Sequence, residues 1–413
     1  MDEIGRRYQA LALRIGRHLA EYIDFWLGDP LLHEVIAAEG PVPPVELHVE
    51  AVTLHEMAAA LPADDAAAVR RREWLLAQLG AMSGITRWLG GEEIAFVDLV
   101  EVLFDLPVTE TPSDDVRRAH RLLDDVLPPG GSLRDRLAAH DNATSVPPDH
   151  LVAAVAFMAE RLRERTRQDL GLPEGESIEL VAVHDRPWGA SAPYLGDLRT
   201  RVELNLDLPA ILGSVTYLAA HEVYPGHHTE RATKEVALWR ESDLGEAAVA
   251  CIYTPEIAIS EGLADLAREV VTTEPDRAAW LRELVAELGL QIPAEAVERE
   301  VAVERARSLL RNLTADAALI LCQQGLPESQ VRAMLAEQAL RTDARIDHDL
   351  RALRAPLGAA YVVSYTASRL IASWLEGQGQ TAGFARLLRE QLSPGQLRTE
   401  LAEPRALYPG SLV

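Results

Sequence analysis

Lysine is almost absent from this sequence. Lys234 is the only lysine among the 413 residues, and the other 39 basic residues are arginines. A phosphate-binding P-loop requires a lysine in a glycine-rich segment, and an enzyme that works through a Schiff base requires a reactive lysine. Because no glycine-rich GKS or GKT segment surrounds Lys234, the sequence argues against both classes of enzyme.

Positive charge as a whole is also scarce. The sequence holds 40 lysines and arginines against 64 aspartates and glutamates, which gives a formal net charge of −24. A surface of this sign repels the phosphates of nucleic acids and the anionic headgroups of membranes. We therefore expect neither nucleic acid nor a membrane among the partners of this protein.

Cysteines and long apolar runs are the other shortages. The two cysteines, Cys251 and Cys322, lie far apart and form no CxxC motif, which excludes a disulfide framework and a thiolate zinc site. The longest apolar run, residues 151–159, is too short to span a bilayer. The N-terminus lacks the basic and then apolar pattern of a secretory signal. We therefore expect a soluble, cytoplasmic protein.

Helical periodicity dominates what is present. Apolar residues recur at helical spacing in the segments 3–27, 45–61, 65–88, 150–167, 276–290, 296–323, 327–341 and 359–377. The stretch 128–149 is rich in proline, glycine and polar residues, which is typical of a boundary. We expect a mainly α-helical fold with an N-terminal helical region, 1–149, and a second domain, 150–413.

Two short segments have the alternating pattern of strands. Residues 177–184 and 200–207 alternate apolar and polar side chains and contain β-branched residues. A segment rich in turn formers, PWGASAPYLGD, lies between them. The pattern predicts two antiparallel strands joined by a long loop, and so a small antiparallel sheet just before the segment described next.

The segment HEVYPGHH, residues 221–228, follows an apolar helix. Its His-Glu pair resembles the start of the HExxH zinc motif, in which two histidines one helical turn apart bind one ion. Here Pro225 stands where the second histidine should be. A break at this proline would bring His227 or His228 beside His221. If two residues loop out, His227 returns to the HExxH phase, which favours it as the second ligand. The spacing alone does not decide between His227 and His228.

A catalytic zinc ion usually has three protein ligands, so another element should supply the third. A helix expected to begin at Thr254 contains Glu261 and Asp265, which lie four residues apart on one face. Glu261 can serve as the third ligand, and Asp265 can orient a ligand histidine from behind. We expect Gly262 to let this helix approach the histidine helix closely.

These residues are similar to a bacterial family called domain of unknown function 885. That family carries a His-Glu-x-x-Pro-Gly-His-His motif and a downstream Glu-Gly-x-Ala segment, which residues 221–228 and 261–264 match. The family is placed among mainly α-helical zinc metallopeptidases of the Glu-zincin type, related in layout to thermostable carboxypeptidases. The resemblance covers roughly residues 170–375.

The resemblance implies a zincin-like catalytic domain with a Zn²⁺ ion held by His221, Glu261 and either His227 or His228. It implies that Glu222 is the general base. It also implies that the strand 200–207 is an edge strand, along which an extended substrate would lie.

A late Pro-Gly-Gln-Ala segment of the family is only partly matched, because the stretch 351–365 keeps the proline and an alanine but lacks the Gly-Gln pair. From this part of the chain we expect Tyr365, or Tyr361, to donate a hydrogen bond to the oxyanion of a tetrahedral intermediate. We expect Tyr361 to contact substrate, and Arg351 or Arg369 to pair with a substrate carboxylate. The incomplete match leaves the substrate class open.

The sequence favours a zinc-dependent metallohydrolase that cleaves a peptide or amide bond of a small substrate, possibly in the manner of a carboxypeptidase. One alternative is that the same metal site serves a non-peptide reaction on a small metabolite. Another is a metal-binding protein without catalysis. The sequence predicts no oligomeric state. Since the site gathers histidines and a cation, to which arginines can add, we expect an electropositive cleft within an acidic exterior.

Overall fold

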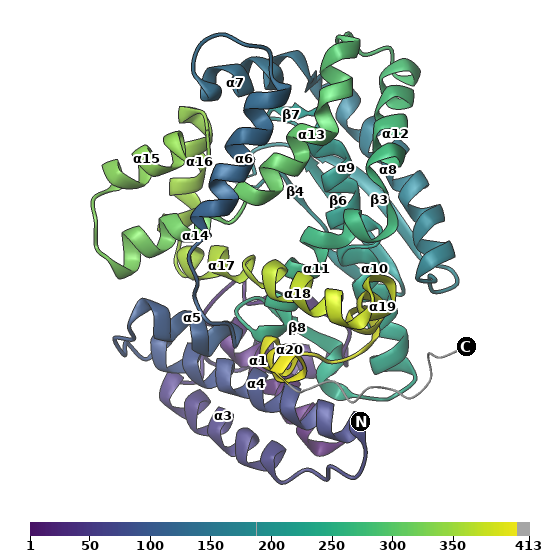
Figure 1. The fold of residues 1–413 in the computed structure, drawn as a ribbon. Coiled ribbons are helices and arrows are strands. Elements are labelled where there is room, and N and C mark those ends of the chain that lie inside the picture. The colour runs from purple at the N-terminus through teal and green to yellow at the C-terminus, as the bar shows by residue number, and fades with distance from the viewer. Residues whose placement is uncertain (187, 403–413) are drawn as a thin grey trace, which may run out of the picture.

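The computed structural model describes residues 1–186 and 188–402 (Figure 1). Helices account for 67% of the chain and the sheets are small, which confirms the mainly α-helical class. No helix in these two ranges is both long and apolar enough to cross a membrane.

The N-terminal part is built from helices of two to seven turns. They are α1 (Glu3–Gly16), α2 (Pro30–Ala38), α3 (Pro44–Ala59), α4 (Ala66–Leu89), α5 (Phe96–Phe104), α6 (Ser113–Val126), α7 (Leu133–Ala143) and α8 (Pro148–Asp169). Several begin at an acidic or hydroxyl side chain that accepts a hydrogen bond from the first helical turn, as at Asp2, Asp65 and Ser132. Such capping residues satisfy backbone donors that have no partner inside the helix.

The rest of the chain continues the helical pattern. Its helices are α9 (Leu212–Leu218), α10 (His227–Lys234), α11 (Pro255–Val271), α12 (Glu274–Glu287), α13 (Ala294–Leu310), α14 (Leu313–Ala318), α15 (Glu328–Glu337), α16 (Asp343–Arg354), α17 (Gly358–Ser364), α18 (Ala367–Gln378), α19 (Gln380–Arg389) and α20 (Pro394–Ala402). The expected helix 359–377 is broken into α17 and α18, where the Thr366 hydroxyl bonds to the carbonyl of Val363.

Two large apolar clusters form the core. One gathers side chains of α1, α3, α4 and α5 with others from α13 to α17, and the second centres on α8, α9, α11, α18 and α19. Helix α6 packs against α13 (Figure 1). The first cluster thus draws on both sides of residue 149, and the domain boundary that we placed there stays a prediction.

The sheet beside the site differs from the expected antiparallel pair. Strand β3 (Ser177–Val183) pairs with β6 (Arg199–Asn205) in parallel. The antiparallel partners of β6 are the short strands β4 (Ala190–Ser191) and β5 (Tyr194–Gly196), which lie in the segment expected to be a loop. The expected pairing of the two long strands was wrong because β5 and β6 form a tight hairpin, which leaves only the other side of β6 for β3.

This arrangement also contradicts the expected edge strand at residues 200–207. Strand β6 is the central strand, with β3 on one side and β4 and β5 on the other. Its backbone groups are therefore used within the sheet and cannot receive an extended substrate by adding a strand. The remaining strands form two small pairs, β1 (Ile23–Trp26) with β8 (Val249–Cys251) and β2 (Ser145–Val146) with β7 (Ala210–Ile211).

The helix that carries His221 breaks where proline and glycine predict a break. Helix α9 widens into a π-helical turn, Ala219–Val223, and the chain then bends through residues 224–226 before α10 begins. The amide of Gly226 donates a hydrogen bond of 2.9 Å to the carbonyl of Ala220. A Cβ atom at Gly226 would lie 1.9 Å from the carbonyl oxygen of His221. The bend therefore requires glycine at this position.

We expect Gly226→Ala to destabilise the fold by about 3 kcal/mol or more, because the added methyl group has no room beside the backbone. Gly80→Ala is the matched control. Gly80 lies inside α4 with nothing within 4 Å of the added atom, so alanine there should stabilise the fold by about 0.5–1 kcal/mol. Urea unfolding measures both changes. Equal stability of the two variants would contradict the crowding at Gly226.

Candidate metal centre

Two histidines from consecutive helical segments face each other. His221 lies on the π-helical turn after α9, and His227 is the first residue of α10. Both are buried, and their rings meet edge to face with centroids 4.7 Å apart. The bend at residues 224–226 thus returns His227 to the side of His221, as the expected break requires.

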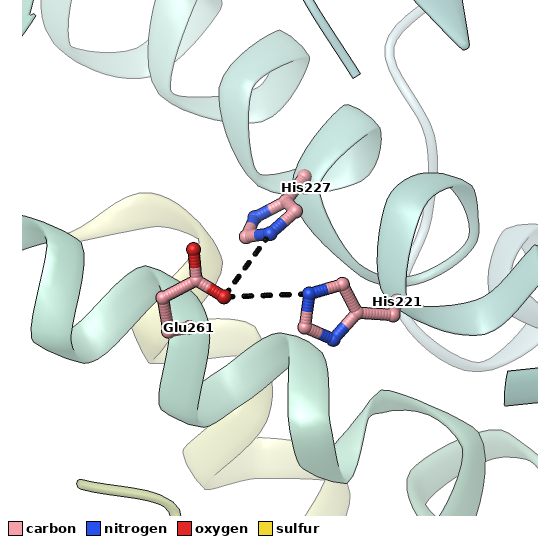
Figure 2. Close-up of side chains that lie close together, drawn as sticks. All are labelled: His221, His227 and Glu261. Carbon is pink, nitrogen blue, oxygen red and sulfur yellow. Dashed lines mark ion pairs between the residues drawn. The ribbon is translucent and has the colours of Figure 1, made fainter. Parts of the chain in front are cut away.

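Glu261 on α11 completes the group (Figure 2). Its Oε2 atom lies 3.3 Å from Nε2 of His221 and 3.7 Å from Nε2 of His227. One ligand atom from each of the three residues lies within 4.8 Å of the others. Helix α11 begins at Pro255 after Thr254, as expected, and its second turn carries the carboxylate toward the histidines.

The donor set fits a zinc ion. Oε2 of Glu261 is buried and accepts no hydrogen bond from another described residue, although a buried carboxylate oxygen without a hydrogen bond is costly. The two imidazoles contact it only as ion pairs, at 3.3 Å and 3.7 Å. Two imidazoles and one carboxylate form a common protein ligand set for catalytic zinc. Burial would raise the pKa of Glu261, but the neighbouring His227 and His221 hold it well below its usual value. The carboxylate is therefore charged and suited to a cation.

Asp265 contacts His221 at the ring nitrogen opposite the one that faces Glu261, as expected. The Nδ1 atom of His221 lies 3.6 Å from a carboxylate oxygen of Asp265 and 3.1 Å from the Tyr217 hydroxyl, which donates to the same carboxylate. Burial would lower the pKa of His221, but Asp265 and Glu261 raise it to about 10. Binding of a metal ion at Nε2 would therefore release a proton from this histidine at neutral pH.

His227 is fixed by a chain of contacts that the sequence analysis missed. Its Nδ1 atom lies 3.0 Å from the hydroxyl of Ser260, which donates to Glu230, and Glu230 in turn accepts from Lys234 at 2.7 Å. Burial would lower the pKa of Lys234, but the charges of Glu230 and Glu256 raise it. The only lysine of the chain thus supports a candidate ligand. Its spacing of four residues from Glu230 on a helix was the one available signal.

His228, the other candidate ligand, points away from this group. Its two ring nitrogens contact the Thr200 hydroxyl at 2.8 Å and a carboxylate oxygen of Glu176 at 2.9 Å. It is fully buried. His228 therefore connects α10 to β6 and to the residue before β3, and the structure assembles the group with His227.

The expected catalytic residues either follow a residue of the group in the sequence or connect to its carboxylate through a tyrosine ring. Glu222 follows His221 on the π-helical turn and is 8% exposed, and its side chain makes no hydrogen bond to another described residue. The hydroxyl of Tyr361 donates to Oε1 of Glu261 at 2.6 Å, so this tyrosine holds the carboxylate in addition to any contact with substrate. Tyr365 packs edge-on against the ring of Tyr361, with centroids 5.8 Å apart.

The two arginines expected to bind substrate do not join the group. Arg351 is exposed on α16. Arg369 donates to the carbonyl of Glu110 and to the hydroxyl of Thr111. A different arginine approaches from the other side: Arg311 forms an ion pair of 2.8 Å with Asp265 and lies over the ring of Tyr217. With 39 arginines in the chain, spacing alone could not single it out.

Gly262 serves a different contact from the one expected. A Cβ atom there would lie 2.9 Å from the backbone of Ala367 and Ser368 on α18. The glycine therefore lets α11 pack closely against α18, rather than against the histidine helix. This contact fixes the position of α11, the helix that carries Glu261, relative to α18.

Comparison with known proteins finds likeness of fold only. No protein-family model matches the chain, and no curated protein matches it. A candidate lipoprotein from Colwellia psychrerythraea has a similar crystal structure, with a TM-score of 0.54 and 13% identity over 86% of this chain and 65% of that one. A candidate lipoprotein of unknown function from Shewanella oneidensis gives a TM-score of 0.47 and 14% identity, over 90% of this chain and 76% of that one. This chain thus spans 65% of the length of the first protein and shares its fold.

Proposed function

We propose that this chain is a zinc-dependent hydrolase that cleaves a peptide or amide bond, in the manner of a carboxypeptidase or a related metallopeptidase. The observation that carries the proposal is the buried group of His221, His227 and Glu261, with ligand atoms within 4.8 Å of one another. The resemblance of residues 221–228 and 261–264 to the family called domain of unknown function 885 supports the same proposal.

Each residue near the group has a distinct proposed role. A zinc ion held by the three ligands would polarise a substrate carbonyl and acidify a water molecule. Glu222 would take a proton from the attacking water and return it to the leaving nitrogen, because it directly follows the candidate ligand His221 and its side chain makes no hydrogen bond to another described residue. Tyr365 would donate a hydrogen bond to the oxyanion.

Metal analysis and a peptide panel test the proposal together. The purified chain should hold ~1 equivalent of zinc, and a chelator should remove the metal and the cleavage activity, both of which zinc restores. Metal without cleavage of any peptide, but with turnover of a small metabolite, would assign the site to a non-peptide reaction. Fewer than ~0.2 equivalents, with no gain on adding zinc, would contradict the proposed metal site.

The proposed location is the cytoplasm. Cys251 and Cys322 are both free thiols, which a reducing compartment preserves. The description of the Colwellia protein as a candidate lipoprotein favours a location outside the cytoplasm as the alternative. Fractionation of cells that express the chain distinguishes the two.

A further inference from the structure

A cavity of about 550 Å³, lined by none of the three residues of the candidate metal centre, plays no part in the proposed chemistry. It lies between the end of α7, the start of α9, the end of α13 and the start of α16. Its volume is within the range of cavities that hold small organic ligands. Four arginines line it: Arg307, Arg311, Arg341 and Arg345. Such a concentration is unexpected in a chain with a net charge of −24.

The carboxylates that face these arginines do not balance their charge. Arg341 and Arg345 share one carboxylate, that of Asp349. Arg345 is also 58% exposed, so part of its guanidinium is open to a ligand. Two guanidinium groups on one carboxylate leave an excess of positive charge and of N–H donors at this end of the cavity.

The opposite wall is also short of negative charge. Arg307 pairs with Asp141, and its Nε atom is buried without a hydrogen-bond partner among the described residues. Burial raises the pKa of Asp141, although Arg307 opposes this shift. Arg311 pairs with Asp265. Four guanidinium groups thus meet three carboxylates, and guanidinium donors bind the oxygens of carboxylates and phosphates in a fork.

Arg311 connects the cavity to the metal centre. Its guanidinium lines the cavity, contacts Asp265 and lies over Tyr217, and these two residues in turn contact His221. Ser214, in the first turn of α9, lines the same cavity, and the end of this helical segment carries His221. A ligand in contact with Arg311 would therefore be linked to His221 through Arg311 and then Asp265 or Tyr217.

We infer that this cavity binds an organic ligand that carries two or more oxyanion groups, either carboxylates or phosphates. Binding there requires neither metal nor turnover, so the inference goes beyond the proposed function.

Titration calorimetry on the metal-free chain tests the inference. The metal is stripped with a chelator, which is then removed by dialysis because it is itself an anion. The probes are the tripeptide Glu-Glu-Glu, the uncharged tripeptide Gln-Gln-Gln and inorganic pyrophosphate. We expect an anionic probe to bind and the uncharged tripeptide not to bind, with an affinity that falls as salt is added.

Three substitutions of the same kind locate the site. Arg345→Gln and Arg307→Gln should each weaken binding about tenfold or more, since each removes a charge-assisted hydrogen bond. Arg351→Gln removes the same charge from an exposed position on α16 and should leave the affinity unchanged. Circular dichroism confirms that each variant is folded.

The outcomes separate the two sources of the ligand and the two proposals. Tighter binding of Glu-Glu-Glu assigns carboxylates, and tighter binding of pyrophosphate assigns phosphates. The inference is overturned if neither anion binds more tightly than Gln-Gln-Gln, or if Arg345→Gln and Arg307→Gln bind the anion as tightly as the unaltered chain does. Because the chain is metal-free, failure of the proposed hydrolase function would leave this result unaffected.

Discussion

His227→Gln should remove the metal from this protein, whereas His228→Gln should leave it in place. The two histidines are neighbours in the sequence, and both are buried. Only His227 has a ring nitrogen near Oε2 of Glu261, at 3.7 Å. Loss of one of three protein ligands should weaken zinc binding by more than the roughly 10–100-fold that changes in outer-shell partners cost.

The second variant serves as the matched control. His228 contacts Thr200 and Glu176 instead of the metal group. His228→Gln removes buried hydrogen bonds and should cost about 1–3 kcal/mol of folding free energy, with zinc content unchanged. A loss of metal in this variant alone would show that the wrong histidine has been placed in the group.

Zinc content after dialysis against a weak chelator measures the difference, and urea unfolding measures the stability. The expected pattern is a crossed one. His227→Gln loses zinc, whereas His228→Gln keeps its zinc and unfolds at a lower urea concentration. Neither a general loss of folding nor a weak metal site in both variants produces that pattern.

Local pattern predicted the parts of the site that depend on neighbouring residues. The proline and glycine at positions 225 and 226 predicted a break, and Glu261 and Asp265 share a helix face because they are four residues apart. Which histidine returns to His221 depended on a π-helical turn. Proline and glycine indicate that such a turn is possible, but they do not fix the phase of the helix that follows.

Contacts between distant segments could not be predicted in the same way. The sequence predicted antiparallel pairing of β3 with β6, whereas the two strands are parallel. The segment between them forms the hairpin of β5 with β6, which its turn-rich composition did not indicate. Ser260 supports His227 from another helix. The cavity lined by four arginines joins residues from 137 to 345, which only the packing of α7, α9, α13 and α16 brings together.

Glu222→Gln should abolish turnover while zinc remains bound. Glutamine keeps the size of the side chain but cannot accept and return a proton, and this proton transfer contributes about 10²–10⁴-fold to a hydrolytic rate. Glu222 is not one of the three residues of the metal group, so the variant should hold as much zinc as the unaltered chain.

The measurement compares cleavage of whichever peptide the unaltered chain cleaves, together with zinc content in the same preparations. Asp265→Asn provides the contrast, because Asp265 contacts His221 from behind. That variant should lose roughly 10–100-fold in zinc affinity. Its activity should recover at high zinc concentration, which Glu222→Gln should not do.

The surroundings of Glu222 single it out among the carboxylates near the metal group. Glu261 accepts a hydrogen bond from Tyr361, and Asp265 is used by Tyr217 and Arg311. Glu222 alone of these three makes no hydrogen bond or ion pair to another described residue, although it is 8% exposed. A general base must lie within hydrogen-bond reach of the water from which it takes the proton. In the proposed mechanism Glu261 holds the metal and Asp265 orients His221, which leaves Glu222 for this role. Full activity of Glu222→Gln would therefore rule out this base, and with it the proposed hydrolytic mechanism.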